Sequence, residues 1–358
     1  MIGHLRHPIA SPFMGGMEAH CHQLVSALVA RGHSVTLFAS GDSDPALPLH
    51  PIVERHYDAE LPWALWNSTP RLAQFLSGAF ECAWAAVTAG EFDVVHNNSM
   101  DPALHHWARR DRQPMVTSLH VPPFATLFSA LCDEAAPWAH QTVTSEAHLA
   151  SWWANPPATA SVVYNGIDTD RWTFRPNGNG RAVWAGRITP NKGTAIALDA
   201  AKYAGIALDV IGPIDCSEYF QAEVVPRLDQ ERVYHGHMQG AELVRMVGES
   251  SVLLATPTWD EPFGLIAAEA MACGVPVAAL DRGALREVIG ACGVLASDAR
   301  SLADAIVAAR RISRAACRQR VEQAFSIRSM IEGYEHAYAA AMAGARASSN
   351  ASTVALLA

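Results

Sequence analysis

Short apolar runs alternate along this chain with longer segments whose apolar residues recur at helical spacing. Residues 16–31 carry such a helical pattern, with Leu24 and Leu28 on one face, and Gly32 ends it. The neighbouring runs 34–39 (SVTLFA) and 115–120 (MVTSLH) have the length and composition of buried strands. Because strands that alternate with helices usually pair in parallel through right-handed crossovers, the pattern predicts an α/β fold built on parallel sheets.

The alternation occurs in two halves, separated by a polar, glycine-rich stretch at residues 175–180 that we interpret as a linker. In the first half we expect strands at residues 2–7, 34–39, 92–96, 115–120, 142–145 and 161–164, helices at 16–31, 72–89 and 103–109, and a loop at 41–51. In the second half we expect strands at residues 182–186, 207–211, 233–235, 251–255, 275–280 and 293–295, and helices at 193–203, 217–228, 240–249, 301–325 and 327–342. A chain of 358 residues is long for one domain and comfortable for two.

The overall composition narrows the class of partners. Half of the residues are hydrophobic, and the formal net charge is −9. A general nucleic-acid or anionic-membrane binder needs a net basic surface, so we expect no nucleic-acid partner. The seven cysteines are scattered without a C-x-x-C pair, the N-terminus lacks an apolar signal region, and no run of about 18 apolar residues occurs. We therefore expect a cytoplasmic protein with reduced thiols and no membrane-spanning helix.

The segment from Glu261 to Pro276 (EPFGLIAAEAMACGVP) carries the most informative chemistry. Its Pro-Phe-Gly turn predicts a helix that begins near Leu265, whose first-turn N–H groups attract anionic or hydroxyl oxygens. Glu269 lies about one turn inside that helix, so Glu269 and Glu261 can reach the same ligand. Backbone donors for oxygen atoms and two carboxylates for sugar hydroxyls together suit a sugar nucleotide.

A second, basic motif extends from Gly186 to Gly193 (GRITPNKG), between a predicted strand and a predicted helix. Arg187 can make a forked contact to phosphate oxygens, and Lys192 adds a charge beside a helix N-terminus. Each such charge-assisted bond is worth about 1.5–3 kcal/mol. A basic loop of this kind is often only a solvated turn, but its position upstream of the glutamate segment favours a phosphate site.

These two motifs resemble the signatures of the family 4 retaining glycosyltransferases, which have the GT-B fold. Glu261 and Glu269 match the family's two glutamates separated by seven residues, and Arg187 and Lys192 match its G-R-x-x-x-x-K-G diphosphate clamp. The resemblance covers nearly the whole chain and is most specific between Arg187 and Pro276. It implies two Rossmann-like domains that face each other across a donor-binding cleft, with a C-terminal helix that crosses back to the first domain.

On this resemblance we expect an acceptor-side domain at residues 1–164 together with a helix at about 327–344, a donor domain at 165–326, and a mobile tail at 347–358. The implied activity is metal-independent transfer of a sugar, with retention, from a nucleoside diphosphate sugar to a hydroxyl group. UDP is the favoured nucleotide, and the acceptor is a small molecule, a glycan or a lipid. No separate cofactor is implied, and the oligomeric state stays open.

The resemblance also assigns residues to the nucleotide. Arg187 and Lys192, together with the amides of Gly15 and Gly16, would stabilise the leaving diphosphate. Glu269 would accept hydrogen bonds from the ribose hydroxyls. The two glycines open the first predicted helix, where a backbone can approach a ligand closely and the helix end favours anions.

A further set of residues is assigned to the sugar and the base. Glu261, followed by the amides of Phe263, Gly264 and Leu265, would hold sugar hydroxyls. His120 ends a predicted strand, on the ligand side of an open α/β sheet, and would contact the donor sugar as a catalytic group alongside Glu261, Arg187 and Lys192. Gly212 and Gly236 match positions that line the nucleotide base.

Metal-dependent alternatives rest on weaker motifs. The D-x-D strings Asp42-Ser-Asp44 and Asp168-Thr-Asp170 are typical of a different, single-domain glycosyltransferase architecture that binds a divalent ion. The first lies in a proline-rich loop and the second in a structural turn of the family. The histidine pairs 20/22, 105/106 and 235/237 lack a metal-ligand spacing that we accept, so we expect no metal site.

Other classes are also considered. The arginines between 310 and 320 favour a solvated helix face over a peripheral membrane patch, because no aromatic stripe accompanies them. An NAD-dependent oxidoreductase would carry G-x-G-x-x-G, which the loop at residues 8–16 lacks, and a phosphorylase would need a lysine for pyridoxal phosphate. A catalytically degenerate nucleotide-sugar-binding protein and another two-domain nucleotide-sugar enzyme, such as an epimerase, remain as alternatives.

Overall fold

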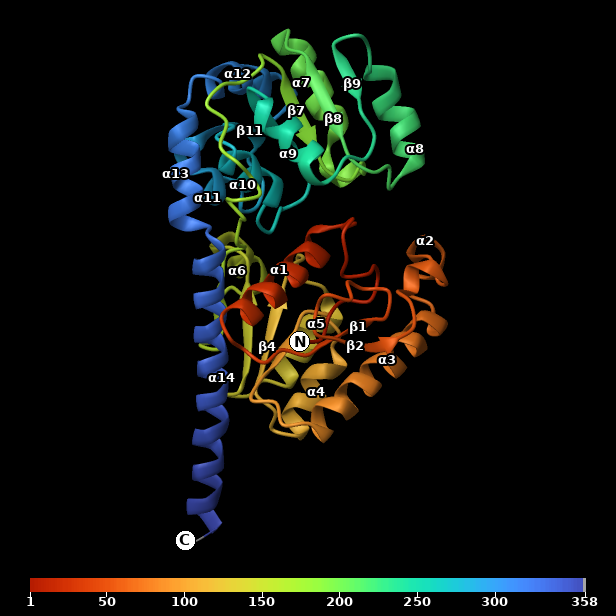
Figure 1. The fold of residues 1–358 in the computed structure, drawn as a ribbon, viewed down its shortest axis with the longest axis vertical. Coiled ribbons are helices and arrows are strands. Elements are labelled where there is room, and N and C mark those ends of the chain that lie inside the picture. The colour runs from red at the N-terminus through yellow and green to blue at the C-terminus, as the bar shows by residue number, and fades with distance from the viewer. Residues whose placement is uncertain (357–358) are drawn as a thin grey trace. The chain divides into compact units, whose positions relative to one another are not determined.

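The computed structural model describes the backbone of residues 1–356 and the side chains of residues 1–348. The chain divides into two compact units (Figure 1). Unit 1 comprises Met1–Thr144, Leu149–Val163 and the chain from Ile331 onward, and unit 2 comprises Ser145–His148 and Tyr164–Met330. Each unit is an α/β fold with parallel strands, as the alternation of elements predicts.

Unit 2 contains one parallel sheet of six strands in the order β9-β8-β7-β10-β11-β12. The strands are β7 (Ala182–Ala185), β8 (Leu208–Ile211), β9 (Arg232–Tyr234), β10 (Val252–Ala255), β11 (Val277–Leu280) and β12 (Gly293–Ala296). The strand order reverses between β7 and β10, and ligands of open α/β sheets bind at the carboxyl ends of strands at such a switch point. Most side chains of these strands are buried, as expected for a sheet covered on both faces.

Helices cover both faces of this sheet (Figure 1). One core joins the sheet to α7 (Thr194–Ala204) and α12 (Ala299–Ala309), and the other joins it to α9 (Gly240–Glu249), α10 (Leu265–Ala272), α11 (Leu285–Ile289) and α13 (Arg314–Ala324). Short turns complete the unit: η2 (Pro190–Lys192), α8 (Ser217–Tyr219), η3 (Phe220–Val224), η4 (Val225–Arg227) and η5 (Gly290–Cys292).

Unit 1 is also built on parallel strands, but they form two separate groups. The strands are β1 (Leu37–Ser40), β2 (Leu49–Val53), β3 (Val95–Asn97), β4 (Met115–Leu119), β5 (Ala139–Val143) and β6 (Ala160–Val162). A pair, β1-β2, and a sheet, β3-β4-β5-β6, are linked by Ile2, which forms parallel bridges to Phe38 of β1 and Asn97 of β3. Ile2 thus takes the place of a central first strand.

The helices of unit 1 begin where local chemistry allows. Thr69 caps α3 (Pro70–Ala89) by accepting a hydrogen bond from the Leu72 N–H, with Pro70 in the first turn. The remaining helical segments are α1 (Gly16–Ala30), η1 (Tyr57–Ala59), α2 (Trp63–Trp66), α4 (Ala103–Arg110), α5 (Ala125–Asp133), α6 (Glu146–Trp152) and α14 (Ile327–Leu356). Helix α14 is continuous, with its first residues in unit 2 and its residues from Ile331 in unit 1.

Several expectations from the sequence are wrong at the level of elements. The strand expected at residues 2–7 is reduced to the bridges of Ile2, because Leu5 and Ile9 bury their side chains without joining a ladder. The loop expected at residues 41–51 ends in strand β2. The helix expected at residues 301–325 is two helices, since Ser313 caps a new helix, α13.

The C-terminal expectation also needs correction. The last helix was expected to end at residue 342, but α14 continues to Leu356. The segment is rich in alanine, the best helix former, and contains no proline. The tail expected at residues 347–358 therefore begins inside this helix, which extends through Leu356; its mobility stays a prediction, and its last two residues lie outside the described residues.

Candidate active site

The loops that follow β7 and β10 meet at the switch point of the unit 2 sheet. The Thr258 N–H donates to the Asn191 carbonyl (2.9 Å), and the Thr256 hydroxyl donates to the Gly193 carbonyl (2.9 Å). Gly193 has a left-handed backbone (φ 67°), and a Cβ at this position would lie 2.0 Å from the Thr256 oxygen. Only glycine therefore lets the two loops approach this closely.

This junction brings together one charged residue from each of the two sequence motifs, Lys192 and Glu261. Lys192 Nζ lies 2.7 Å from Glu261 Oε2, with side chains 24% and 16% exposed. Trp259 Nε1–H donates to the same oxygen (3.0 Å), and the Lys192 ammonium lies 5.1 Å from the centre of the Trp259 ring. Within the described part of the chain, no hydrogen bond is made to Glu261 Oε1. One carboxylate oxygen is thus anchored while the other can accept a hydroxyl.

Arg187 lies at the end of β7 but is already paired. Its Nη1 lies 2.7 Å from Asp215 Oδ2, and the two side chains are 40% and 36% exposed. Asp215 belongs to the loop after β8, so the pair crosses neighbouring loops at the carboxyl edge of the sheet. An exposed pair of this kind contributes little to stability, and the guanidinium retains donors for a second anion.

Gly212 and Gly236 lie together at the ends of β8 and β9. The Gly212 N–H donates to the Gly236 carbonyl (2.9 Å), and the Tyr234 hydroxyl donates to the Gly212 carbonyl (2.8 Å). A Cβ on Gly212 would lie 1.7 Å from the Gly186 oxygen, so glycine is required there by packing. At Gly236 the requirement is the backbone itself, with φ 79° and open space around it.

Helix α10 begins at Leu265, as predicted, directly after Gly264 in the left-handed region (φ 87°). The first-turn amides of a helix have no intrahelical acceptors and can donate to a ligand. The side chain of Phe263 is turned into the core, since the residue is 2% exposed and its ring packs edge-on against Phe325 (centroids 5.4 Å apart). Phe263 can therefore contribute only its backbone to a ligand, while its side chain anchors the turn.

Glu269 lies in the middle of α10 in an unusual electrostatic setting. Burial raises the pKa of its carboxyl to about 7, and nearby Arg171 opposes this rise. Its carboxylate accepts no hydrogen bond from any residue whose side chain the structure describes. A desolvated carboxylate without donors gains most from a ligand that brings hydroxyl groups to it.

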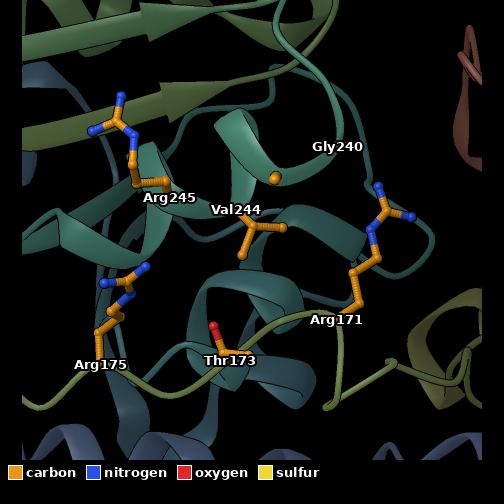
Figure 2. Close-up of a pocket in the computed structure, with 7 residues that line it drawn as sticks. Arg171, Thr173, Arg175, Gly240, Val244 and Arg245 are labelled. Carbon is orange, nitrogen blue, oxygen red and sulfur yellow. The ribbon is translucent and has the colours of Figure 1, made fainter.

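Next to Arg171 lies a pocket of about 310 Å³ in unit 2 (Figure 2). Figure 2 shows Val244 of α9 facing the segment that carries Thr173, with Arg171 on one side and Arg175 and Arg245 on the other. Arg245 pairs with Glu249, whereas Arg171 and Arg175 form no ion pair with any of the described side chains. The pocket has an apolar floor and a cationic rim.

The candidate residues of unit 1 lie at the carboxyl edge of its own sheet. Gly15 is the N-cap of α1, has an extended backbone and provides no side-chain cap, and Gly16 is the first helical residue. His120 directly follows β4, and its Nε2 lies 2.8 Å from Asn98 Oδ1. Asn98 follows β3, so two neighbouring strand ends hold this histidine.

The discounted motifs have structural explanations. Asp42 pairs with His56, Asp44 pairs with His22, and Asp168 Oδ1 accepts the N–H groups of the two residues at 170 and 171 as a turn. Among residues 1–348, no group of three His, Cys, Asp or Glu side chains could hold a metal ion.

The arginines of α13 are not the solvated face that the sequence suggests. Arg314, Arg318 and Arg320 donate to backbone carbonyls of unit 2, among them those of Gly248, Ala272 and Val288. These guanidiniums fasten α13 to the ends of other elements. No helix in the described part of the chain is both long and apolar enough to cross a bilayer.

Sequence reasoning missed three residues of this region. Trp259 lies two positions before Glu261, Asp215 follows the Gly212 turn, and Arg171 follows the Asp168 turn. None belongs to the motifs quoted above, so their only signal was proximity in sequence to predicted site positions.

Comparison with known proteins matches both halves of the chain. The family described as "Glycosyltransferase Family 4" matches residues 14–171, and the one described as "Glycosyl transferases group 1" matches residues 179–310. The "Phosphatidyl-myo-inositol mannosyltransferase" of Mycobacterium leprae is 28% identical over 335 residues, covering 85% of this chain and 86% of that protein.

Solved structures agree on the fold. AviGT4, a glycosyltransferase involved in avilamycin A biosynthesis, superposes with a TM-score of 0.71 at 20% identity, covering 96% of this chain and 98% of that one. Anabaena Alr3699/HepE, solved with UDP-glucose, gives 0.70 at 18% identity, covering 94% and 97%. Together with the matches along both halves, these relatives show that the chain belongs to the family 4, group 1 glycosyltransferases of the GT-B fold.

Proposed function

We propose that this glycosyltransferase transfers a sugar, with retention, from a nucleoside diphosphate sugar to a hydroxyl group without the help of a metal ion. The observation that carries the proposal is the ion pair between Lys192 and Glu261 (2.7 Å), at the switch point of unit 2 and followed by the donor-free carboxylate of Glu269. This arrangement supports one cation for a diphosphate, one carboxylate for sugar hydroxyls and one carboxylate for a ribose.

The proposed mechanism follows from the charges at these loops. Negative charge develops on the diphosphate as the glycosidic bond breaks, and Lys192 and Arg187 stabilise it without a metal. Glu261 Oε1 and the first-turn amides of α10 hold sugar hydroxyls, and Glu269 holds the ribose. The leaving diphosphate takes the proton of the acceptor hydroxyl, which attacks from the same face. The roles of Gly15, Gly16 and His120 of unit 1 are part of this proposal, as the family resemblance implies them.

UDP is proposed as the nucleotide. The support is indirect: Anabaena Alr3699/HepE shares the fold and was solved with UDP-glucose. The proposed acceptor is a small molecule, a glycan or a lipid, and the name of the M. leprae relative, a phosphatidyl-myo-inositol mannosyltransferase, supports an inositol lipid as one candidate. We propose a cytoplasmic location with at most peripheral membrane contact.

Thermal unfolding with a panel of UDP, GDP, ADP and their glucose and mannose conjugates tests the proposal. A ligand at 100 times its Kd adds about 2.7 kcal/mol of stability. We expect a shift with one nucleotide that is lost in Glu269→Ala and retained in Glu242→Ala, an exposed glutamate of α9. No shift with any compound would contradict the proposal. Binding of a nucleotide sugar without transfer to any hydroxyl would instead support a catalytically degenerate binding protein. Conversion of the bound sugar into an isomer would support an epimerase.

A further inference from the structure

A buried polar network crosses the unit 1 sheet beneath its carboxyl edge. Ser118 of β4 and Thr142 of β5 are register partners, and their hydroxyls lie 3.0 Å apart. His96 of β3 places its Nε2 2.9 Å from the Ser118 hydroxyl. All three side chains are at most 4% exposed. Three adjacent strands therefore present polar groups on one face, where apolar residues are usual.

Helix α14 supplies the partners of this network. The Tyr338 hydroxyl lies 2.7 Å from His96 Nδ1, and the Ser118 hydroxyl donates to the Tyr334 oxygen (3.1 Å). The two tyrosine rings stack with centroids 6.3 Å apart. The tyrosine hydroxyls are thus fixed by groups of the sheet.

His20 of α1 connects this network to the candidate catalytic histidine. Its Nε2 lies 3.2 Å from the Tyr334 hydroxyl, and its ring centroid lies 4.5 Å from that of His120. His20 is 5% exposed, and burial lowers its pKa to about 3, so the ring is neutral. Its Nδ1 is buried and has no hydrogen-bond partner within residues 1–348.

The partnerless nitrogen is the feature that packing alone leaves unexplained. A buried polar atom without a partner costs stability that an apolar side chain of similar size would not. Because the Ser118 hydroxyl donates to the Tyr334 oxygen, the Tyr334 O–H is left to donate to His20 Nε2, and the proton of the neutral His20 ring then lies on the partnerless Nδ1. The imidazole of His20 bonds Tyr334 through one nitrogen and packs its ring against His120. Support of the His120 ring therefore explains why an imidazole occupies this position.

We propose that Tyr334 and His20 are positioning residues that hold the His120 ring in its working orientation for sugar transfer. Asn98 fixes one ring nitrogen of His120, and the His20 ring supports the imidazole from a second direction. Helix α14, which begins in unit 2, thereby contributes to the order of a catalytic group in unit 1. The role in transfer rests on the proposed function, but the order of the His120 ring does not.

NMR of protein labelled with ¹³C,¹⁵N-histidine tests the ring order without substrate. The His120 signals are identified by their loss in His120→Asn. We expect one narrow set of His120 signals in the wild type, and broadened or doubled signals in His20→Ala and in Tyr334→Phe. Tyr334→Phe removes a single oxygen, so it keeps the test usable if His20→Ala does not fold. Unchanged His120 signals in Tyr334→Phe would overturn the proposal.

Turnover with the donor found above gives the second readout. Tyr334→Phe should lower kcat about tenfold while the donor KM stays within about twofold, as expected for a misoriented catalytic group. The matched control is Tyr338→Phe, which removes another buried hydroxyl from the same helix, one that bonds His96 and not His20, and it should keep kcat. Equal losses in the two variants would indicate a structural role only. Failure to find any donor would count against the proposed function and leave the NMR test standing.

Discussion

Two polar clusters of this molecule are built in opposite electrostatic ways. In unit 2, Lys192, Glu261 and Trp259 form a charged, partly exposed group on loops at the carboxyl edge of the sheet. In unit 1, His20, His96 and their hydroxyl partners form a network that is buried and neutral within the fold. Charge held at a surface can be redirected to a ligand, whereas a buried neutral network can only maintain geometry.

The difference should appear most strongly as unequal losses of stability in the two units when the pH is lowered. His20, His96 and His105 have pKa values lowered by burial, to about 3 for His20 and about 4 for His105. Since the unfolded state binds protons from about pH 6.5 downward, each histidine should cost unit 1 about 2 kcal/mol between pH 7 and pH 5.

Amide hydrogen exchange, corrected for its intrinsic pH dependence, measures this effect for each unit. Protection of β4 should fall between pH 7 and pH 5 by more than protection of β10, and His105→Phe should reduce the loss in β4. An equal loss of protection in both units would contradict the contrast.

Lys192→Ala should have the largest effect on catalysis. Without its ammonium the diphosphate loses a preorganised cation and Glu261 loses an anchor, so kcat/KM should fall by about 10²–10³. The chain offers a matched control, because its only other lysine is the exposed Lys202 at the end of α7. Lys202→Ala should behave as the wild type. Wild-type turnover in Lys192→Ala would remove the charged cluster from the mechanism.

Two glycine-to-alanine substitutions compare the stability cost of a Cβ at the loop junction with its cost at the end of a helix. Gly193→Ala should lower the free energy of unfolding by about 3 kcal/mol, because the new Cβ would meet the Thr256 oxygen. Gly205, at the other end of α7, is also left-handed (φ 63°) but has open space, so Gly205→Ala should cost only about 1 kcal/mol. Denaturant unfolding of both variants measures the difference. Equal losses of unfolding free energy would mean that the loop junction can shift to accommodate the new Cβ.

Glu269→Gln should sharpen the account of the desolvated carboxylate. The folded pKa is about 7, above the ordinary value of 4.5, so the stability that the protonated group provides is present below pH 4.5 and lost as the pH rises through 7. The variant should therefore be more stable than the wild type by about 2 kcal/mol at pH 8 and equal to it at pH 4. Chemical denaturation at both pH values provides the measurement. A variant less stable at pH 8 would show that the carboxylate has a protein partner.

The smallest expected effect concerns Arg171. Its charge holds down the pKa of Glu269, so Arg171→Ala should raise that pKa and leave less carboxylate at pH 7. UDP should then bind about two- to threefold more weakly, as expected for an exposed charge. Arg175→Ala, in the same pocket, is the control and should not change UDP affinity. Calorimetric titration of UDP at pH 7 and pH 9 measures this effect. The loss of UDP affinity in Arg171→Ala should vanish at pH 9, because Glu269 is then ionised in both proteins.

Much of unit 2 could be predicted from the sequence, because its signals are local. Gly193 and Gly264 mark backbone conformations that few other residues adopt, and the helices beginning at Thr194 and Leu265 follow directly. Less of unit 1 could be predicted. Ile2 gains its place in the sheet through single bridges to residues far along the chain, and the His20 network joins positions more than 300 residues apart. Such contacts leave no periodicity in the sequence.

The same limit applied to the candidate site. Lys192 and Glu261 were predicted to bind the same ligand, and they lie in contact with each other. Their motifs follow β7 and β10, which are neighbouring strands at the switch point of the sheet. Trp259 and Asp215 were missed, since their roles depend on which loops face each other. Phe263 was assigned to the ligand through its amide, which stays a prediction, and the packing of its ring against Phe325 was not foreseen from the motif.

The most direct test of the charged cluster is calorimetric titration of UDP and uridine into the wild type, Lys192→Ala and Lys202→Ala. The ratio of the two affinities isolates the contribution of the diphosphate, and comparison between proteins isolates the part that Lys192 provides. We predict that Lys192→Ala reduces this ratio by about 10- to 100-fold, while Lys202→Ala leaves it unchanged. An identical ratio in all three proteins would contradict the claim that unit 2 uses Lys192 to bind a diphosphate.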